Sequence, residues 1–340
     1  MARPPKPRTR STRHKIGIVS QFVIPLAVAV IPKLVPDHGQ AAATKVVVQA
    51  PAPAAAQVQP VAPLALPAPD AAPPPAPIPT GIAPAACLRR FQAIGLPYQR
   101  GDDAAANEVL VCRRGYALGY DGTTHDPDWV IEHISPGDLT GTAKRSNKFG
   151  QDPALAAHDA SLADYRAADA AGHHFDRGHQ APAGDAKFDQ AVMDQSFYLT
   201  NMAPQVGIGF NRGAWKYLEE TVRSWVLCGG HKELFVITGP IYPDRSADTI
   251  GTDKVIVPRA FFKIVYDPAG QRAVGFVLKN EKLGAKLANL QDYVVPITNI
   301  EGETGLAFFR NLDLRTQSLL KDQAGVAWGH IGTCSTGGSD

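Results

Sequence analysis

The stretch FDRGHQAP, residues 175–182, decides the fold, and it is followed by LTNMAPQ at 199–205 and NRGAWKYLEETVR at 211–223. These three polar clusters lie among short apolar runs of strand length. A histidine, an asparagine, a glutamate and several arginines are therefore available to a single site, provided that the chain brings the three clusters together.

His179 is the residue in the first cluster best suited to acid-base chemistry, because an imidazole is half-deprotonated near neutral pH. We predict that it lies in a loop before a strand. A phosphodiester is anionic and slow to hydrolyse, so its cleavage needs a base for water, a cation and a proton source. The alternative is a core histidine held by hydrogen bonds, and the neighbouring polar clusters favour the base.

The third cluster opens a predicted helix over residues 211–226, whose apolar positions 215, 218, 222, 225 and 226 follow helical spacing and should pack on a sheet. At about 100° per residue, Asn211, Glu219 and Arg223 fall to one side of that apolar face. The Asn211 carbonyl suits a hydrated Mg²⁺, Glu219 could hold one of the waters, and Arg223 could pair with phosphate. The alternative for Glu219 and Arg223 is a surface ion pair between residues four apart.

The remaining apolar runs are short, rich in β-branched and aromatic residues, and bounded by Gly, Pro or Asp, which is typical of strands. An antiparallel sheet crossed by the 211–226 helix gives an α+β domain. The predicted strand regions are EVLVCRRGYALGY at 108–120, DWVIEHI at 128–134, FYLTNM at 197–202, LFVITGPIY at 234–242, VIVP at 255–258, FFKIVYD at 261–267 and AVGFVL at 273–278.

These strings resemble the DNA/RNA non-specific endonuclease family of the endonuclease G and Serratia nuclease type. DRGH at 176–179 is similar to the family signature, and an Asn followed eight residues later by Glu and four more by Arg fits Asn211, Glu219 and Arg223. The resemblance spans most of residues 95–334. It also covers CRRGYALGYD at 112–121, WVIEHISP at 129–136, YLTNMAPQ at 198–205, TGPIY at 238–242 and VPRAFFK at 257–263.

The resemblance implies a ββα-metal (His-Me finger) fold and hydrolysis of DNA and RNA to 5′-phosphate and 3′-hydroxyl ends. It implies that His179 takes a proton from water and that Asn211 is the one direct protein ligand of a hydrated Mg²⁺ or Mn²⁺. Glu219 would orient water at the metal, and Arg223 would steady the charge of the transition state. The residues implied to hold the site or the substrate are Arg177, Asn201 and Arg145.

Other functions and partners stay open at this point. The chain could be a nucleic-acid-binding protein of the same fold without turnover, or a nuclease toxin held by an immunity partner. The resemblance also suggests a homodimer, and whether an inhibitor protein guards the producer stays open. The formal net charge is +2, but residues 1–15 alone carry +6, so the rest of the chain is slightly acidic. Phosphate binding must therefore come from a locally basic cleft.

The N-terminal 83 residues differ in composition from the rest. We expect an export signal or membrane anchor over 1–40, with the apolar run IGIVSQFVIPLAVAVIP at 16–32, and a disordered linker over 41–83. Between Pro51 and Pro79, Pro and Ala supply 21 of 29 residues, which favours an extended spacer. We therefore predict an exported, periplasmic or extracellular protein, tethered to the membrane if uncleaved, with residues 84–340 as the nuclease domain. A mitochondrial presequence and a disordered basic tail are the alternatives.

The four cysteines, Cys87, Cys112, Cys228 and Cys334, lack a C-x-x-C pair, which argues against a structural zinc site. With an export signal in front, we predict a disulfide between Cys87 and Cys112 that pins the start of the domain to its first strand. Four buried thiols are the alternative, and the pairing of Cys228 and Cys334 is left open.

Overall fold

The computed structural model describes residues 85–101, 108–155, 159–170, 172, 174–242 and 248–329. The predicted N-terminal segments, 1–40 and 41–83, lie outside the described residues, and their boundaries stay predictions. Within the described ranges, no helix combines the length and apolar character needed to cross a membrane.

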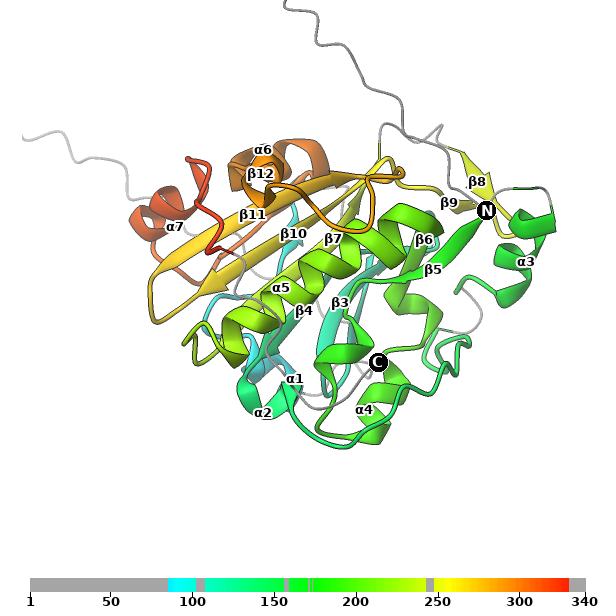
Figure 1. The fold of residues 1–340 in the computed structure, drawn as a ribbon, viewed down its shortest axis with the longest axis horizontal. Helices are drawn as coiled ribbons and strands as arrows, with labels where there is room; N and C mark the ends of the chain where they lie inside the picture. The colour runs from blue at the N-terminus through cyan, green and yellow to red at the C-terminus, as the bar shows by residue number, and fades with distance from the viewer. Residues whose placement is uncertain are drawn as a thin grey trace, which may run out of the picture. The chain divides into compact units, whose positions relative to one another are not determined.

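A mixed-length antiparallel sheet forms the centre of the described part of the chain (Figure 1). Its seven strands have the order β12-β11-β10-β7-β4-β3-β2, and each neighbouring pair runs antiparallel. This confirms the predicted α+β class. The bounds are β2 Glu108–Cys112, β3 Tyr116–Asp121, β4 Asp126–Ile134, β7 Leu234–Ile241, β10 Ala260–Asp267, β11 Arg272–Lys279 and β12 Val294–Val295.

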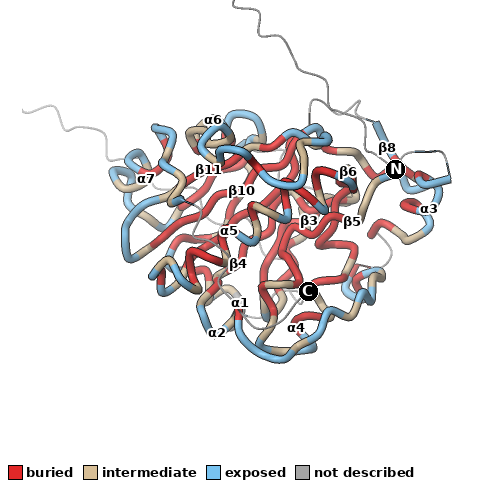
Figure 2. The backbone as a smooth tube through the Cα atoms, in the orientation of Figure 1, coloured by how far each residue is buried: buried red, intermediate tan, exposed pale blue. Residues whose placement is uncertain are grey.

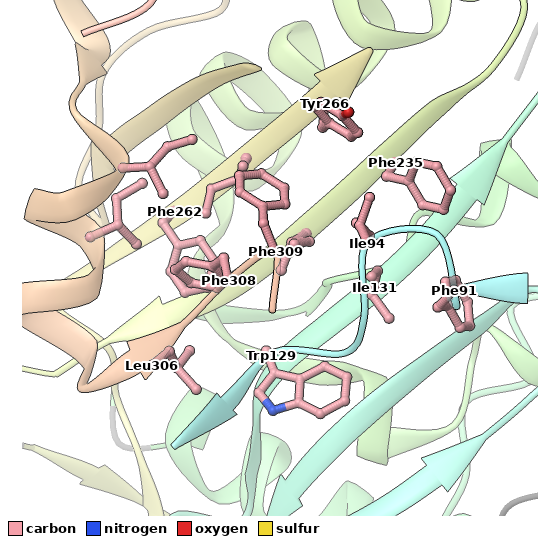
Figure 3. Packing of buried hydrophobic residues seen from close by; sticks show 14 of the residues in the cluster. Phe91, Ile94, Trp129, Ile131, Phe235, Phe262, Tyr266, Leu306, Phe308 and Phe309 are labelled. Atoms are coloured by element: carbon pink, nitrogen blue, oxygen red, sulfur yellow. The ribbon is translucent and has the colours of Figure 1, made fainter. Parts of the chain in front are cut away.

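Both faces of the sheet are covered, and its central strands are buried over most of their length (Figure 2). Successive residues of a strand point to opposite faces. In β10, Phe262 and Tyr266 therefore pack with Phe308 and Phe309 on one face (Figure 3), whereas Phe261 joins the cluster beneath helix α5 (Lys216–Leu227). Because both faces of the sheet are covered, residues that point to either face are buried, and these strands are mostly apolar along their whole length.

A pair of antiparallel strands and the helix that follows it form the site region. Strand β5 (Phe175–His179) pairs antiparallel with β6 (Met202–Val206), and the π-helical segment η3 (Gly207–Trp215) leads from β6 into α5. The strand predicted over 197–202 is absent from 197–201, and only Met202 belongs to a strand, as the first residue of β6. Leu199–Asn201 form a 3-10 turn because the carboxamide of Asn201 binds neighbouring backbone groups instead of continuing a ladder.

Helix α5 buries its predicted apolar face against the sheet, which confirms that part of the prediction. The described residues at positions 215, 218, 222, 225 and 226 are all buried. The helix begins at Lys216, however, and Gly213 has non-helical φ −135° and ψ −109°. Asn211 therefore lies before the helix, and the 100° rotation that related it to Glu219 does not apply.

The other elements complete the two faces and the edges. Helices α6 and α7 lie beside β11 in Figure 1. The bounds of the remaining helices are α1 Ala85–Arg90, α2 Pro136–Leu139, α3 Leu162–Ala170, α4 Gln190–Gln195, α6 Ile297–Thr304 and α7 Leu314–Lys321. Two short strand pairs are β1 Tyr98–Gln99 with β13 Leu306–Ala307 and β8 Thr249–Ile250 with β9 Val255–Ile256. The 3-10 turns are η1 Ala183–Asp185, η2 Leu199–Asn201 and η4 Leu290–Tyr293.

Candidate active site

A cavity of about 420 Å³ lies where β5, η3 and α5 meet, and we call it the catalytic cavity. It brings together most of the residues singled out from the sequence, although they come from three separate segments. The residues that line it include His179, Asn211, Glu219, Arg223, Arg177, Arg145, Asp176, Arg212, Lys187 and Lys216. Six of these ten side chains are cationic against two carboxylates, so the wall is basic although the body of the chain is slightly acidic.

His179 is the last residue of β5 and pairs with Met202, so its predicted position in a loop was wrong. The residue is 8% exposed, and the rings of Phe149 and Phe197 meet the imidazole edge-on. Burial, and then the nearby guanidinium of Arg145 and that of Arg177, lower the pKa of His179 to about 3. The imidazole is therefore neutral at neutral pH and able to accept a proton.

The Nε2 atom of His179 is buried and has no hydrogen-bond partner among the described residues. A buried polar atom without a partner is costly, so this nitrogen requires a hydrogen-bonding group. Gly178, one residue before His179, allows β5 to pack closely against the Gln205 side chain of β6. A Cβ at Gly178 would lie 2.1 Å from the Gln205 side chain on the paired strand, so the glycine of the DRGH motif is required by contact with β6.

Asn211 is oriented by Asp176, the first residue of the DRGH motif. No role was predicted for Asp176 from the sequence. The Asn211 Nδ2 donates to Asp176 Oδ2 at 2.8 Å, and Arg212 Nε lies 2.9 Å from the same oxygen. Because the amide nitrogen is committed to Asp176, the carbonyl Oδ1 is the Asn211 atom that remains to bind a ligand. The position of Asp176, in DRGH itself, was the signal that could have identified it.

Arg223 lies on the cavity wall and pairs with a carboxylate that sequence reasoning missed. Its Nη1 donates to Asp185 Oδ1 at 2.8 Å, and the two side chains are only 14% and 6% exposed. The alternative of a surface ion pair with Glu219 is therefore wrong for Arg223. Nothing in the FDRGHQAP motif indicates Asp185 beyond its closeness in sequence.

Glu219 faces a buried lysine from the sheet beneath the helix. Burial raises the pKa of Glu219 to about 7, and the positive charges of Lys263 and Arg223 oppose that rise. Lys263 is 1% exposed, its Nζ donates to Thr238 Oγ1 at 2.6 Å, and it lies 5.0 Å from the centre of the Trp215 ring. The sequence analysis included Lys263 in a motif and gave it no function, because a lysine in a strand normally faces solvent.

Asn201 was predicted to hold the site or the substrate, and it is not among the residues that line the catalytic cavity. It is wholly buried, and its Nδ2 donates to the carbonyls of Ala181 and Ser196 at 2.9 and 2.8 Å. Its Oδ1 accepts from the Ala181 amide at 2.9 Å. Asn201 therefore positions the chain just after His179 and cannot reach a substrate.

Arg145 and Arg177 both lie on the cavity wall, each with its guanidinium over an aromatic ring. The Arg177 Cζ is 4.3 Å from the centre of the Phe149 ring, and the Arg145 Cζ is 5.0 Å from that of Phe197. The same two rings contact His179. Both cations are thus held next to the imidazole, where they can attract an anionic phosphate.

The donor set fits a hydrated hard cation. Among the described residues, no group of three His, Cys, Asp or Glu side chains is arranged to hold a metal ion. An amide oxygen and a nearby carboxylate in an open polar cavity suit Mg²⁺, which keeps several of its waters and uses few protein ligands. Asn211 and Glu219 supply those two oxygens here.

The structure shows the bonding state of two of the four cysteines. Cys112 and Cys228 are each disulfide-bonded. This rules out free thiols at these two positions. The side chain of Cys87 and the whole of Cys334 lie outside the described residues. The pairing of Cys87 with Cys112 therefore stays a prediction.

The family of the chain follows from its match to known proteins. Residues 98–315 match the family model described as DNA/RNA non-specific endonuclease. The chain belongs to this family. The matched range contains all the residues of the catalytic cavity named above, so the DNA/RNA non-specific endonuclease family is assigned over the part of the chain that forms the site.

Individual members of the DNA/RNA non-specific endonuclease family agree with this assignment. Nuclease C1 of Cunninghamella echinulata is 38% identical over 233 residues, covering 64% of this chain and 89% of that protein. The mitochondrial endonuclease G of Bos taurus is 37% identical, covering 64% and 74%. The crystal structure of the EndoG/EndoGI complex matches with a TM-score of 0.57 and 28% identity over 67% of this chain and 94% of that chain. This confirms the predicted ββα-metal fold.

The same relatives overturn the predicted location. The bovine relative is named as mitochondrial, as are relatives from Saccharomyces cerevisiae and Homo sapiens. These names point to mitochondria and contradict the prediction of an exported, periplasmic or extracellular protein. The basic stretch and apolar run had no acidic residue before Asp37, and such a composition is shared by export signals and mitochondrial presequences.

Proposed function

We propose that this nuclease is a Mg²⁺- or Mn²⁺-dependent endonuclease that hydrolyses DNA and RNA without sugar specificity, leaving 5′-phosphate and 3′-hydroxyl ends. The observation that supports the proposal best is that His179, Asn211, Glu219 and Arg223 line one basic cavity. A basic wall of guanidinium and ammonium groups reads phosphates, which DNA and RNA share.

His179 is the proposed general base. Its imidazole is neutral and lines the catalytic cavity, where it would accept the proton of the attacking water. Burial against two aromatic rings holds the imidazole in place, and the buried Asn201 fixes the backbone immediately after it. Because the imidazole is already neutral, it does not have to lose a proton before it can activate the water.

The other residues hold the phosphate and the ion. Asn211 would hold the divalent cation through Oδ1, with Asp176 fixing the amide, and Glu219 would hold water beside it. The cation, when bound, offsets the charge that develops on the phosphate and on the leaving oxygen. Arg223, fixed by Asp185, and the cations Arg145 and Arg177 would bind the phosphate oxygens.

The proposal is tested with the purified full chain on plasmid DNA and on RNA. We expect nicking and then degradation of both nucleic acids with Mg²⁺ or Mn²⁺, and loss of cleavage with EDTA. The products should carry 5′-phosphates that a phosphatase removes. Binding without metal-dependent cleavage would instead indicate a nucleic-acid-binding protein of this fold. Cleavage of only one of the two nucleic acids would overturn the absence of sugar specificity.

The proposed partners extend beyond the nucleic acid. The structural relative is the EndoG/EndoGI complex, a crystal structure that describes the mechanism of EndoG inhibition. We propose that this chain also forms a homodimer and binds a protein inhibitor. Sedimentation of the purified chain, alone and with its candidate inhibitor, measures both.

The pH profile should depend on Glu219 and not on His179. Burial raises the pKa of Glu219 to about 7, whereas burial lowers that of His179 to about 3, so of these two groups Glu219 changes charge near neutral pH. The ionised carboxylate forms as pH rises through 7, so kcat/KM should rise about tenfold per pH unit below that value and then level off. Glu219→Gln should lower activity and flatten the profile. If the variant retained the same acid limb, another group would be responsible.

A further inference from the structure

A second cavity of about 580 Å³ adjoins the catalytic cavity, and we call it the side groove. Asp176, Arg177 and Arg212 line both, so the two spaces share a wall. Ile208 and Lys282 line the side groove but not the catalytic cavity. None of the roles assigned above uses these two residues.

The cations of the side groove are available to an anion. Lys282 is exposed and has no ion-pair partner among the described residues. Arg212 pairs with Asp176 through Nε, yet its side chain is 62% exposed, so the remaining guanidinium edge faces solvent. A phosphate that leaves the catalytic cavity along the shared wall would therefore meet Arg212 and then Lys282.

Ile208 adds a large apolar surface beside these cations. It is 70% exposed, which is unusual for an isoleucine in an otherwise well-packed segment. The backbone holds it there. The amides of Leu283 and Gly284 both donate to the Gly209 carbonyl, at 3.1 and 3.0 Å, and tie the Lys282 loop to the segment that carries Ile208.

Gly209 makes this close approach possible. Its φ is +86°, and a Cβ at this position would lie 2.6 Å from Lys282 Cγ. The apolar side chain and the ammonium group are therefore presented together by a fixed backbone. Arg177, Arg212 and Lys282 line the groove together with the carboxylates of Asp169 and Asp176, which leaves an excess of one positive charge. The groove thus offers cations for a phosphate beside an apolar surface for a base, and sites for single-stranded nucleic acid likewise combine cations with a surface that contacts bases.

We propose that the side groove binds the nucleotide next to the scissile phosphate in a single strand of DNA or RNA. Arg212 and Lys282 bind its phosphate, and Ile208 contacts its base. The proposal rests on the nuclease function proposed above and names the substrate that the same site prefers. It requires no base-specific hydrogen bond, so it agrees with cleavage that is independent of sequence.

The test compares a small phosphodiester, bis(p-nitrophenyl) phosphate, with a single-stranded oligonucleotide as substrates of the full chain. The small substrate fills only the catalytic cavity. For Lys282→Ala and Ile208→Ser we expect the KM of the oligonucleotide to rise about five- to tenfold, with kcat and turnover of the small substrate within about twofold of the parent. Lys282→Ala should also reduce the salt dependence of binding by about one phosphate contact.

Two matched controls remove similar groups elsewhere on the surface. Lys232→Ala removes an exposed lysine beyond the end of α5, and Val326→Ser removes an apolar side chain that is 73% exposed. Neither should change KM. A rise in KM no larger than in these controls would overturn the proposal, as would an equal loss of activity on the small phosphodiester.

Failure of the nuclease function would be seen separately. A parent chain that cleaves neither substrate contradicts that function, and fluorescence anisotropy of the labelled oligonucleotide in EDTA then decides the side groove. Weaker binding by Lys282→Ala and Ile208→Ser than by the two controls would support the groove. Equal binding by all four variants would overturn it.

Discussion

His179→Ala should lower kcat on DNA and RNA by about 10²- to 10⁴-fold, the usual contribution of a positioned general base. The expected loss follows from the imidazole, which is buried on the cavity wall, neutral because its pKa is lowered to about 3, and unpartnered at Nε2. KM should change little, because Arg145, Arg177 and Arg223 still bind the phosphate. Steady-state kinetics on plasmid DNA and on RNA measures both constants.

The control for this substitution is metal binding. Asn211 and its partner Asp176 remain in His179→Ala, so the affinity for Mn²⁺ measured by calorimetry should equal that of the parent. The thermal unfolding midpoint should also be close to that of the parent. Parental kcat in His179→Ala would show that another group activates water, and lost Mn²⁺ affinity would show that the substitution disturbed the whole site.

Lys263→Met should be the most destabilising substitution among the residues near the site. Lys263 is a fully buried cation beneath α5, and it faces Glu219 from the helix, Glu132 from β4 and Asp185 from η1. Removing one partner from a buried set of opposite charges leaves the others uncompensated and typically costs about 3–5 kcal/mol. Denaturant unfolding monitored by fluorescence measures the free energy of unfolding directly.

A second substitution separates charge from packing in this result. Burial raises the pKa of Glu132 well above its ordinary value, and the charge of Lys263 opposes that rise. The double variant Lys263→Met with Glu132→Gln removes the buried cation together with one of the carboxyl groups that face it, so it should regain part of the lost stability. Lys232→Ala, on the surface, should change stability by less than about 0.5 kcal/mol. A cost below about 1 kcal/mol for Lys263→Met would contradict the role given to its charge.

The strands and the apolar face of α5 could be predicted because local patterns determine them. The runs that became β4, β7, β10 and β11 are mostly apolar and of strand length, and the buried positions of α5 follow helical spacing. The interpretation was wrong at residues 197–201. The run is apolar enough for a strand, but Asn201 uses its side chain to bind the backbone after His179, a contact between residues twenty apart that no local pattern indicates.

The chemistry of the site was only partly visible in the sequence. Motif spacing indicated His179, Asn211, Glu219 and Arg223, and all four line one cavity. The groups that orient and charge them were missed because they come from separate elements. Asp185 belongs to a 3-10 turn and Lys263 to a central strand, and their meeting with Arg223 and Glu219 depends on how the helix lies across the sheet.

The central claim is that His179 and Asn211 act on the same phosphate, and a crystal structure of His179→Ala with Mn²⁺ and a short oligonucleotide tests it most directly. We expect an anomalous Mn²⁺ peak within about 2.1 Å of the Asn211 Oδ1, the distance typical of a small hard cation, with a phosphate bound between the ion and position 179. An ion bound away from Asn211, or a phosphate too far from position 179 for one water to lie between them, would contradict it.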